Sequence, residues 1–132
     1  PAEIKATIEI AKELNKPINV VYQPFQNLRQ YDIKQEYAHC FDGINNLFWL
    51  DTYLAREPKR KKIIEKEDLA KEVKTKLNLK TAELDNNLAE EILNLAKTET
   101  VVLIGAGSID SWARENFIKE PPKILKLLKS KY

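Results

Sequence analysis

The sequence predicts a three-layer α/β fold, in which helices cover both faces of a mostly parallel β-sheet. Segments with helical periodicity alternate along the chain with short apolar runs, which is typical of parallel strands joined by right-handed helical crossovers. These apolar runs do not alternate with polar residues, as expected for strands buried on both faces. The 132 residues suffice for one domain with a substantial core. We therefore expect a Rossmann-like domain over residues 1–120 and a basic helical tail over 121–132.

The first half of the chain contains two predicted helices and two predicted strands. Residues 3–14 place apolar side chains three or four positions apart, which predicts a helix that ends before a proline. Residues 18–22 form a β-branched run and predict a buried strand, followed by a loop over 24–30. An apolar stripe over 31–44 predicts the second helix, and the run at 47–51 predicts the second strand.

The second half begins with a polar loop over residues 52–62 and then resumes the alternation. The elements predicted after this loop are a helix marked by Leu69, Val73 and Leu77, a short edge strand over 78–81, a helix marked by Leu84, Leu88, Ile92 and Leu95, a strand over 100–104, and a helix over 108–118.

Composition excludes several classes of protein. No apolar run approaches the ~20 residues that a transmembrane helix needs, and no signal-peptide pattern opens the chain, so we expect no membrane partner. A single cysteine, Cys40, excludes an internal disulfide framework and a cysteine-built metal site, which favours the cytoplasm. The chain contains no Met and starts at Pro1, so we expect it to be part of a longer protein; removal of an initiator Met is the alternative.

Two short segments carry the positive charge. Residues 56–62 and residues 119–132 each carry +4, and because the whole chain carries +2, the remaining residues carry −6. The first segment could meet phosphates or nucleic acid, but it lacks interleaved aromatic residues, so we predict a solvated, mobile loop and no nucleic-acid partner. The second could form a membrane-surface helix, although docking onto its own domain or the parent protein is favoured.

The loops that follow the predicted strands are the candidate site. The carboxyl ends of parallel strands share one edge of the sheet, and ligands of open α/β sheets bind there. The candidate residues in these loops are Gln23, Arg29, Asp51, Tyr53, Glu57, Gly105, Gly107 and Ser108.

Each candidate allows a functional and a purely structural interpretation. The turn from Gly105 to Ser108 could cradle an anion on free backbone N–H groups, or it could be a tight turn with Ser108 as the helix N-cap. Asp51 could bind a cation or a ribose hydroxyl, or be a solvated strand end. Arg29 could clamp a carboxylate or a phosphate through its planar guanidinium, or lie on the surface.

Four other residues with reactive or aromatic side chains are predicted to be structural. His39 falls off the apolar stripe of its helix and should be exposed, whereas Cys40 borders that stripe and should be a core thiol. Trp49 and Trp112 should belong to the core and not to stacking platforms.

Four ordered motifs resemble the C-terminal domain of the Mur ligases. They are Pro1-Ala2-Glu3-Ile4 at the start of a helix, Val20-Val21-Tyr22-Gln23-Pro24, Leu50-Asp51-x-Tyr53 with Glu57, and Val102-Leu103-Ile104-Gly105-Ala106-Gly107-Ser108-Ile109. The resemblance extends in order and spacing from residue 1 to about residue 118.

The resemblance implies a Rossmann-like domain of a cytoplasmic, three-domain, ATP-dependent ligase of peptidoglycan synthesis. In that family ATP and Mg²⁺ activate a carboxylate as an acyl phosphate, which an amino group attacks to form an amide. The implied partners are the central ATPase domain of the parent chain, a UDP-muramoyl substrate and an amino acid. By resemblance, Gln23, Arg29, Tyr53 and Glu57 would contact substrate, whereas Asp51, Gly105, Gly107 and Ser108 would contact nucleotide.

The loop after the first strand departs from the family pattern Gln-Pro-His-Arg-Tyr-Ser/Thr-Arg. Only Gln23, Pro24 and Arg29 match, and Phe25, Gln26 and Asn27 replace the expected His, Arg and Tyr. A domain that has lost catalysis and serves as a binding or scaffold module is therefore the alternative. The family's His-His motif would lie before Pro1, so we expect this chain alone to be inactive and to hold no cofactor tightly.

Overall fold

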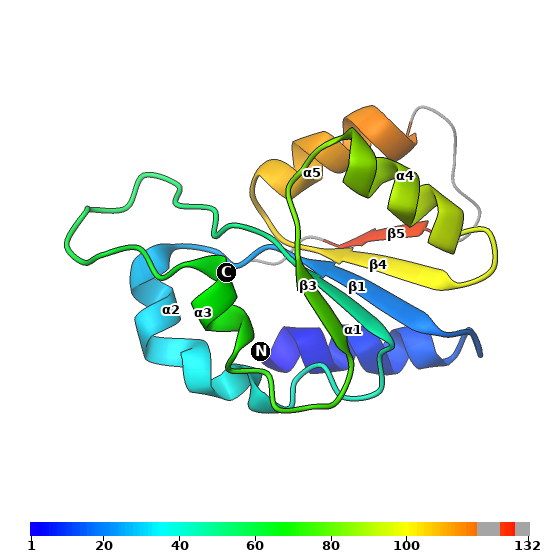
Figure 1. Ribbon diagram of the computed structural model, residues 1–132, viewed down its shortest axis with the longest axis horizontal. Coiled ribbons are helices and arrows are strands. Elements are labelled where there is room, and N and C mark those ends of the chain that lie inside the picture. Colours follow the sequence, from blue (N-terminus) through cyan, green and yellow to red (C-terminus); the bar gives the residue numbers. More distant parts are fainter. Residues whose placement is uncertain (119–124, 129–132) are drawn as a thin grey trace.

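Five parallel strands form one sheet in the computed structural model, which describes residues 1–118 and 125–128 (Figure 1). The strand order is β3-β2-β1-β4-β5, with β1 at the centre. The strands are β1 (Ile18–Tyr22), β2 (Asn46–Trp49), β3 (Asn78–Thr81), β4 (Thr100–Ile104) and β5 (Leu125–Leu128). The three-layer, Rossmann-like α/β fold predicted from the sequence is thereby confirmed.

Helices cover both faces of the sheet. On one face lie α1 (Ala2–Lys12), α2 (Asn27–Ile33) with a 3₁₀ turn at Lys34–Ala38, and α3 (Lys66–Ala70) (Figure 1). On the other lie α4 (Asn86–Leu95) and α5 (Ser108–Ala113), which continues as a π-helical turn at Arg114–Ile118. We call these the α1 face and the α4 face.

The two faces have separate cores of different chemistry. The core under the α1 face contains an aromatic group in mutual contact: Tyr22, Tyr37, Phe41 and Trp49. The core under the α4 face is built from aliphatic side chains such as Ile92 and from two phenylalanines. Each buried strand contributes side chains to both cores, because successive side chains along a strand point to opposite faces of the sheet.

The helix predicted over 31–44 is wrong at both ends. Its α-helical part begins at Asn27, within the predicted loop, because the carboxylate of Glu57 accepts hydrogen bonds from the first N–H groups of α2. The chain then leaves α geometry after Ile33. Tyr37 and Phe41 are nevertheless fully buried, so the apolar stripe is satisfied by a 3₁₀ turn and an irregular turn.

The helix predicted around Leu69, Val73 and Leu77 is also shorter than expected. Its α-helical part ends at Ala70, and turns carry the chain to β3. The edge strand predicted at 78–81 is confirmed with the expected bounds.

The basic helical tail is wrong where the structure describes it. Residues Leu125–Leu128 form a fifth strand that pairs in parallel with β4, so the sheet extends beyond the boundary predicted at residue 120. Without β5, the backbone groups on one side of β4 would lack strand partners. A strand can form hydrogen bonds with these groups, whereas a helix at the same place would not. The other tail residues, including Pro121 and Pro122, lie outside the described residues.

Candidate functional site

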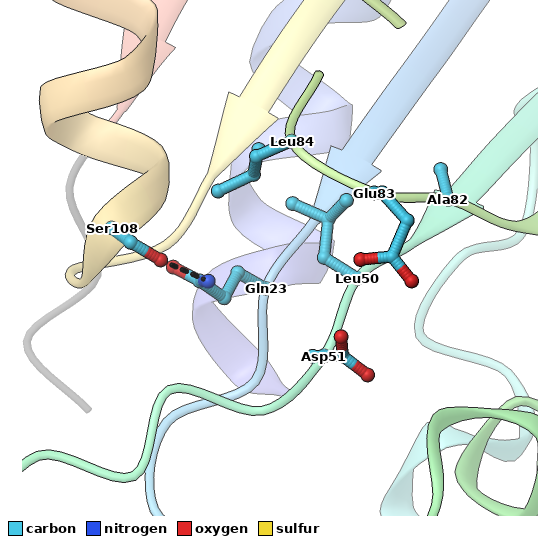
Figure 2. Close-up of a pocket in the computed structure, with 7 residues that line it drawn as sticks. All are labelled: Gln23, Leu50, Asp51, Ala82, Glu83, Leu84 and Ser108. Atoms are coloured by element: carbon cyan, nitrogen blue, oxygen red, sulfur yellow. Dashed lines mark hydrogen bonds between the residues drawn. The ribbon is translucent and has the colours of Figure 1, made fainter.

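The carboxyl edge of the sheet carries a cleft of about 220 Å³ (Figure 2), bordered on the α4 face by Leu50 and Leu84. We call it the edge cleft; its lining residues are Gln23, Leu50, Asp51, Ala82, Glu83, Leu84 and Ser108. Figure 2 shows Gln23 and Ser108 on one side of the cleft and the carboxylates of Asp51 and Glu83 on the other. The three predicted loops therefore meet at one edge, as the parallel topology requires.

Gln23 holds the loop after β1 against the start of α5. Its Nε2 donates to Ser108 Oγ at 2.8 Å, and its Oε1 accepts from the N–H of Ile109 at 3.0 Å. The side chain is 4% exposed, and both ends of its amide are satisfied within the chain. Gln23 is thus a structural clamp that lines the cleft.

The turn before α5 does not present a free anion cradle in its first helical residues. The N–H of Ile109 is taken by Gln23, and the N–H of Asp110 is donated to the carbonyl of Gly107 at 3.0 Å. Ser108 is not the N-cap, because Gly107 occupies that position and no side chain caps the helix. These two N–H groups are therefore not free for an anion, and the prediction that Ser108 is the N-cap is wrong.

Two glycines in this turn are required by close contacts. A Cβ at Gly105 would lie 2.6 Å from Ile109 Cγ2, and a Cβ at Gly107 would overlap the ring of Tyr53. Tyr53 itself is 37% exposed and stacks on Phe25, with ring centroids 6.0 Å apart. The two residues also form a parallel β-bridge, so the loops after β1 and β2 continue side by side past the sheet.

A lysine organises the acidic side of the cleft. Lys66, the first residue of α3, places its Nζ 2.5 Å from Glu83 Oε1 and 3.4 Å from Asp51 Oδ1. Its side chain is 10% exposed, whereas both carboxylates are mostly exposed. Burial alone lowers the pKa of Lys66, but the hydrogen bond with Glu83 and the charge of Asp51 outweigh burial and raise that pKa.

A second, more open cavity of about 440 Å³ continues from these residues, and we call it the acidic groove. Its lining residues are Asp51, Glu65, Lys66, Glu67, Thr81, Ala82 and Glu83. Four carboxylates and one ammonium face this space, so its charge is negative. An anionic ligand would meet a more favourable potential elsewhere along the edge.

Glu57 lies away from the edge cleft. Its Oε1 accepts from the N–H of Asn27 at 2.8 Å and its Oε2 from the N–H of Leu28 at 3.3 Å. A carboxylate at a helix N-terminus is stabilised by the unpaired N–H groups and the helix dipole. The structure therefore places Glu57 where it positions α2, and it does not line the cleft.

Arg29 lies on the α1 face, apart from Asp51 and Ser108. It borders a narrow pocket of about 20 Å³ together with Tyr22, Gln30 and the N-terminal residues of α1. The expectation that Arg29, Asp51 and the turn at Gly105–Ser108 line one shared cleft is therefore wrong for Arg29. β1 separates the two sites, because Tyr22 faces one core and Gln23 lines the cleft.

A buried chain of polar groups lies beside that pocket. The hydroxyls of Tyr22 and Tyr37 are 2.8 Å apart, and Tyr37 donates to Gln30 Oε1 at 2.5 Å. Gln30 Nε2 then donates to the carbonyl of Phe25 at 3.1 Å. Burial raises the pKa of both tyrosines far above the usual range, so they act as neutral structural groups.

The residues predicted to be structural are placed as expected. His39 is exposed and Cys40 is 2% exposed; burial raises the pKa of the Cys40 thiol to about 12. Trp49 is fully buried, and the partly buried Trp112 packs against the α4 face core. Among the described residues, no cluster of His, Cys, Asp and Glu could hold a metal ion, and no helix has the length and apolarity needed to cross a bilayer.

Sequence reasoning missed two residues at the edge. Glu83 follows β3 by two positions, so the rule that selected Asp51 after β2 would also have selected it. Lys66 gave no signal, because its contacts with Asp51 and Glu83 join positions far apart in the sequence.

The fold, the strand order and the loops at the carboxyl edge define an open parallel α/β domain with a cleft at its carboxyl edge. Comparison with known proteins finds similarity to UDP-N-acetylmuramate–L-alanine ligases. That of Rickettsia africae is 31% identical over 122 residues, which is 87% of this chain and 25% of the relative. That of Rhizobium etli is 34% identical over 120 residues, which is 86% of this chain and 25% of the relative.

The predicted resemblance is thus confirmed by relatives that are named as ligases of UDP-N-acetylmuramate and L-alanine. It spans about a quarter of the length of the curated relatives that it matches. No family model matches the chain.

Proposed function

We propose that this chain is the C-terminal domain of an ATP-dependent ligase that forms an amide bond between a UDP-muramoyl substrate and an amino acid. The observation that carries the proposal is the similarity to UDP-N-acetylmuramate–L-alanine ligases over 87% of the chain. The coincidence of the four motifs with one sheet edge supports it. Catalysis then requires the rest of the parent protein, which we expect to be cytoplasmic.

The proposed role of the edge cleft is to receive part of the nucleotide. Asp51 is mostly exposed and lies at the carboxyl end of β2, where a carboxylate accepts hydrogen bonds from ribose hydroxyls in related folds. Ser108 Oγ is already bonded to Gln23 and would accept or donate one further hydrogen bond. The acidic groove repels phosphates, so the phosphate chain of a bound nucleotide would extend away from Glu65 and Glu67.

Magnesium ligands are assigned to the remainder of the parent protein. The described residues contain no cluster that fits a metal ion, and the acidic residues of the edge cleft are bridged by Lys66. Bound ATP and Mg²⁺ would supply carboxylate activation as an acyl phosphate. This chain's own part is to orient the nucleotide and the amino acid and to exclude water when the domains close.

The residues of the loops after β1 and β2 have two proposed roles, which are contact with substrate and positioning of a helix. Tyr53 is partly exposed at the edge and remains a candidate contact for substrate, as does Arg29 from the α1 face. Gln23 and Glu57 position the starts of α5 and α2, and they act on substrate only through those helices.

The test uses the full-length parent protein. ADP release is measured with ATP, Mg²⁺, UDP-N-acetylmuramate and each amino acid in turn, and the amide product is identified by mass. We expect ADP release that depends on both substrates. Asp51→Ala should raise the KM for ATP, whereas the exposed Lys16→Ala, on the opposite edge of the domain, should leave it unchanged.

The second candidate is a Mur-like binding or scaffold domain without catalysis, which the loop at 25–28 specifically favours. Phe25 stacks on Tyr53 and Asn27 binds the backbone around Ile64, so positions that would hold the family's His and Tyr now make internal contacts. Absence of substrate-dependent ADP release from a folded, full-length parent would favour this candidate; turnover with any amino acid would exclude it.

A further inference from the structure

The loop between β2 and α3 carries a dense group of cations that the proposed function does not use. We call residues 56–62 the basic arm; its five cations are Arg56, Lys59, Arg60, Lys61 and Lys62. The arm follows β2 from the carboxyl edge of the sheet, and the whole loop extends outward beside α2 (Figure 1). All five of these side chains are exposed.

The base of the arm is fastened to α2 by named contacts. Asn27 Oδ1 accepts from the N–H of Ile64 at 2.8 Å, and Asn27 Nδ2 donates to the carbonyl of Lys62 at 3.1 Å. The hydroxyl of Tyr31 donates to the same carbonyl at 2.5 Å. Asn27 is 2% exposed, so the end of the arm is anchored in a protected position.

The single carboxylate within the arm does not neutralise its neighbours. Both oxygens of Glu57 accept backbone N–H groups at the start of α2, which fixes the beginning of the arm as Asn27 fixes its end. The negative charge is therefore directed at the helix N-terminus. The arm presents more positive charge outward than its formal +4 suggests.

None of the five cations of the arm has an acidic partner among the described residues, and the ammonium of Lys61 lies over the ring of Tyr31. Lys12 and Lys80 are paired with glutamates, whereas Lys16 has no ion-pair partner among the described residues, so the arm differs from the rest of the surface in the density of its cations. Like charges held within a few residues repel one another unless an anion lies between them. An anchored loop that keeps five cations together is suited to bind several negative charges at once.

We propose that the basic arm binds a compact ligand that carries two or more phosphate groups, of the chemical class of pyrophosphate or a nucleoside diphosphate. This goes beyond the proposed function, because it concerns neither the edge cleft nor the residues assigned to it. A small ligand fits better than a long polyanion, because the residues outside the two basic segments carry −6 and would repel the remainder of a long polyanion.

The aromatic residue beside the arm supports a phosphate ligand over a single-stranded nucleic acid. Lys61 Nζ lies over the ring of Tyr31, 4.5 Å from its centroid, so that face of the ring is covered and cannot stack on a base. Ile63, just after the arm, is 46% exposed, and one isolated apolar side chain provides little insertion into a lipid surface.

The test is a titration of the ¹⁵N-labelled chain with inorganic pyrophosphate, followed by backbone amide shifts. We expect saturable shifts confined to residues 56–62 and their anchors on α2. The triple variant Arg56→Gln, Lys59→Gln and Arg60→Gln should bind about tenfold more weakly and show a smaller salt dependence. UDP should bind at the same residues, whereas uridine should not.

A matched control removes the same charge elsewhere. Lys16, Lys76 and Lys97 are exposed, and they are replaced together by Gln. This variant should retain pyrophosphate affinity to within about twofold. Equal losses in both triple variants would assign binding to the net charge of the chain and overturn the proposal, as would the absence of saturable binding to the wild-type chain.

A third variant tests whether the anchoring matters. Tyr31→Phe removes only the hydrogen bond to the carbonyl of Lys62 and keeps the ring beneath Lys61. We expect about threefold weaker binding with an unchanged salt dependence, because the cations remain but their arrangement loosens. A single-stranded oligonucleotide that binds the same residues more tightly than pyrophosphate would identify a nucleic-acid surface and contradict the proposal.

Discussion

The two faces of the sheet differ in the chemistry of their cores and in what they present at the carboxyl edge. The α1 face encloses aromatic rings joined by a buried chain of hydrogen bonds from Tyr22 through Tyr37 to Gln30. The α4 face core contains no ionisable side chain among its buried members. Arg29 lies at the edge on the first face, whereas the edge cleft is bordered by Leu50 and Leu84 on the second.

The difference shows that, at the carboxyl edge of the sheet, residues on one face position the loop after β1, whereas residues on the other face also line the edge cleft. On the α1 face, Gln30 carries the polar chain to the carbonyl of Phe25 and so fixes the loop after β1. On the α4 face, apolar packing holds α5 and α4, and Gln23 makes a long-range polar contact with the start of α5. The loop after β1 is therefore fixed by polar contacts on both faces, through Gln30 on the α1 face and through Gln23 on the α4 face.

The largest expected effect is a cavity in the α4 face core. Ile92 is fully buried in α4, and Ile92→Ala should lower the free energy of unfolding by about 2–5 kcal/mol, because the removed methylenes leave space that helix packing cannot refill. Urea unfolding followed by circular dichroism measures the change. Leu93→Ala, at a position 46% exposed in the same helix, should cost within about 0.5 kcal/mol and serves as the control.

The next effect breaks the polar chain of the α1 face. Tyr37→Phe removes the hydroxyl between Tyr22 and Gln30, leaving Gln30 Oε1 without its buried donor, and should cost about 1–3 kcal/mol. Tyr22→Phe should cost less, because Tyr22 contributes one end of the chain and the bond from Tyr37 to Gln30 survives. Equal losses in urea unfolding for the two variants would contradict this order of contacts.

Alkaline pH should distinguish the faces without any substitution. Burial raises the pKa of Cys40 to about 12 from its ordinary 9.0, and it raises the pKa of Tyr22 and Tyr37 as well. The unfolded chain therefore loses these protons first, binds fewer protons than the folded chain, and gains relative stability as pH rises. The free energy of unfolding should fall from about pH 9 upward, more steeply above about pH 10.

The variant Cys40→Ala sharpens this prediction. It removes the thiol that ionises first in the unfolded chain. The free energy of unfolding should therefore begin to fall about one pH unit later, and the contribution of the two tyrosines should remain. Urea midpoints measured at a series of pH values give the curve. A wild-type curve that stays flat up to pH values at which the unfolded tyrosines ionise would contradict burial of the α1 face hydroxyls.

Local sequence predicted the strands better than the helices. β1 and β4 fall at the predicted residues, because buried parallel strands need only short runs of β-branched and apolar residues. The helix predicted over 31–44 failed because its start depends on Glu57, which is distant in sequence, and the same apolar spacing can be satisfied by turns. The strand at 125–128 failed because an isolated Leu-Lys-Leu-Leu run suits a helix or a strand equally.

The sequence predicted those parts of the candidate site that depend only on the order and direction of the strands. Gln23, Asp51 and Ser108 meet because they follow neighbouring parallel strands, and strand order alone requires that. Arg29 lies on the other face because α2 begins early and places it beside the first residues of α1, and that early start depends on Glu57, which is distant in sequence. The roles of these residues toward nucleotide and substrate remain predictions.

The smallest expected effect concerns Lys66, which joins the two faces. Its helix packs on the α1 face through Leu69, yet its Nζ reaches Asp51 and Glu83 at the edge cleft on the other side. Lys66→Ala should cost no more than about 1 kcal/mol, because both carboxylates are largely solvated. Lys66→Arg should retain most of that contribution, and raising the salt concentration should narrow the difference between the two variants.

The raised pKa of Lys66 gives this contact a pH signature of its own. Its contribution is complete below the unfolded pKa of about 10.4 and is lost as pH rises through the folded pKa, so the difference between wild type and Lys66→Ala should vanish in strong alkali. Stability differences between these two proteins, measured in urea at pH 8 and at pH values above about 11, test this. A difference that persists unchanged would show that packing of the side chain, and not its charge, connects the two faces.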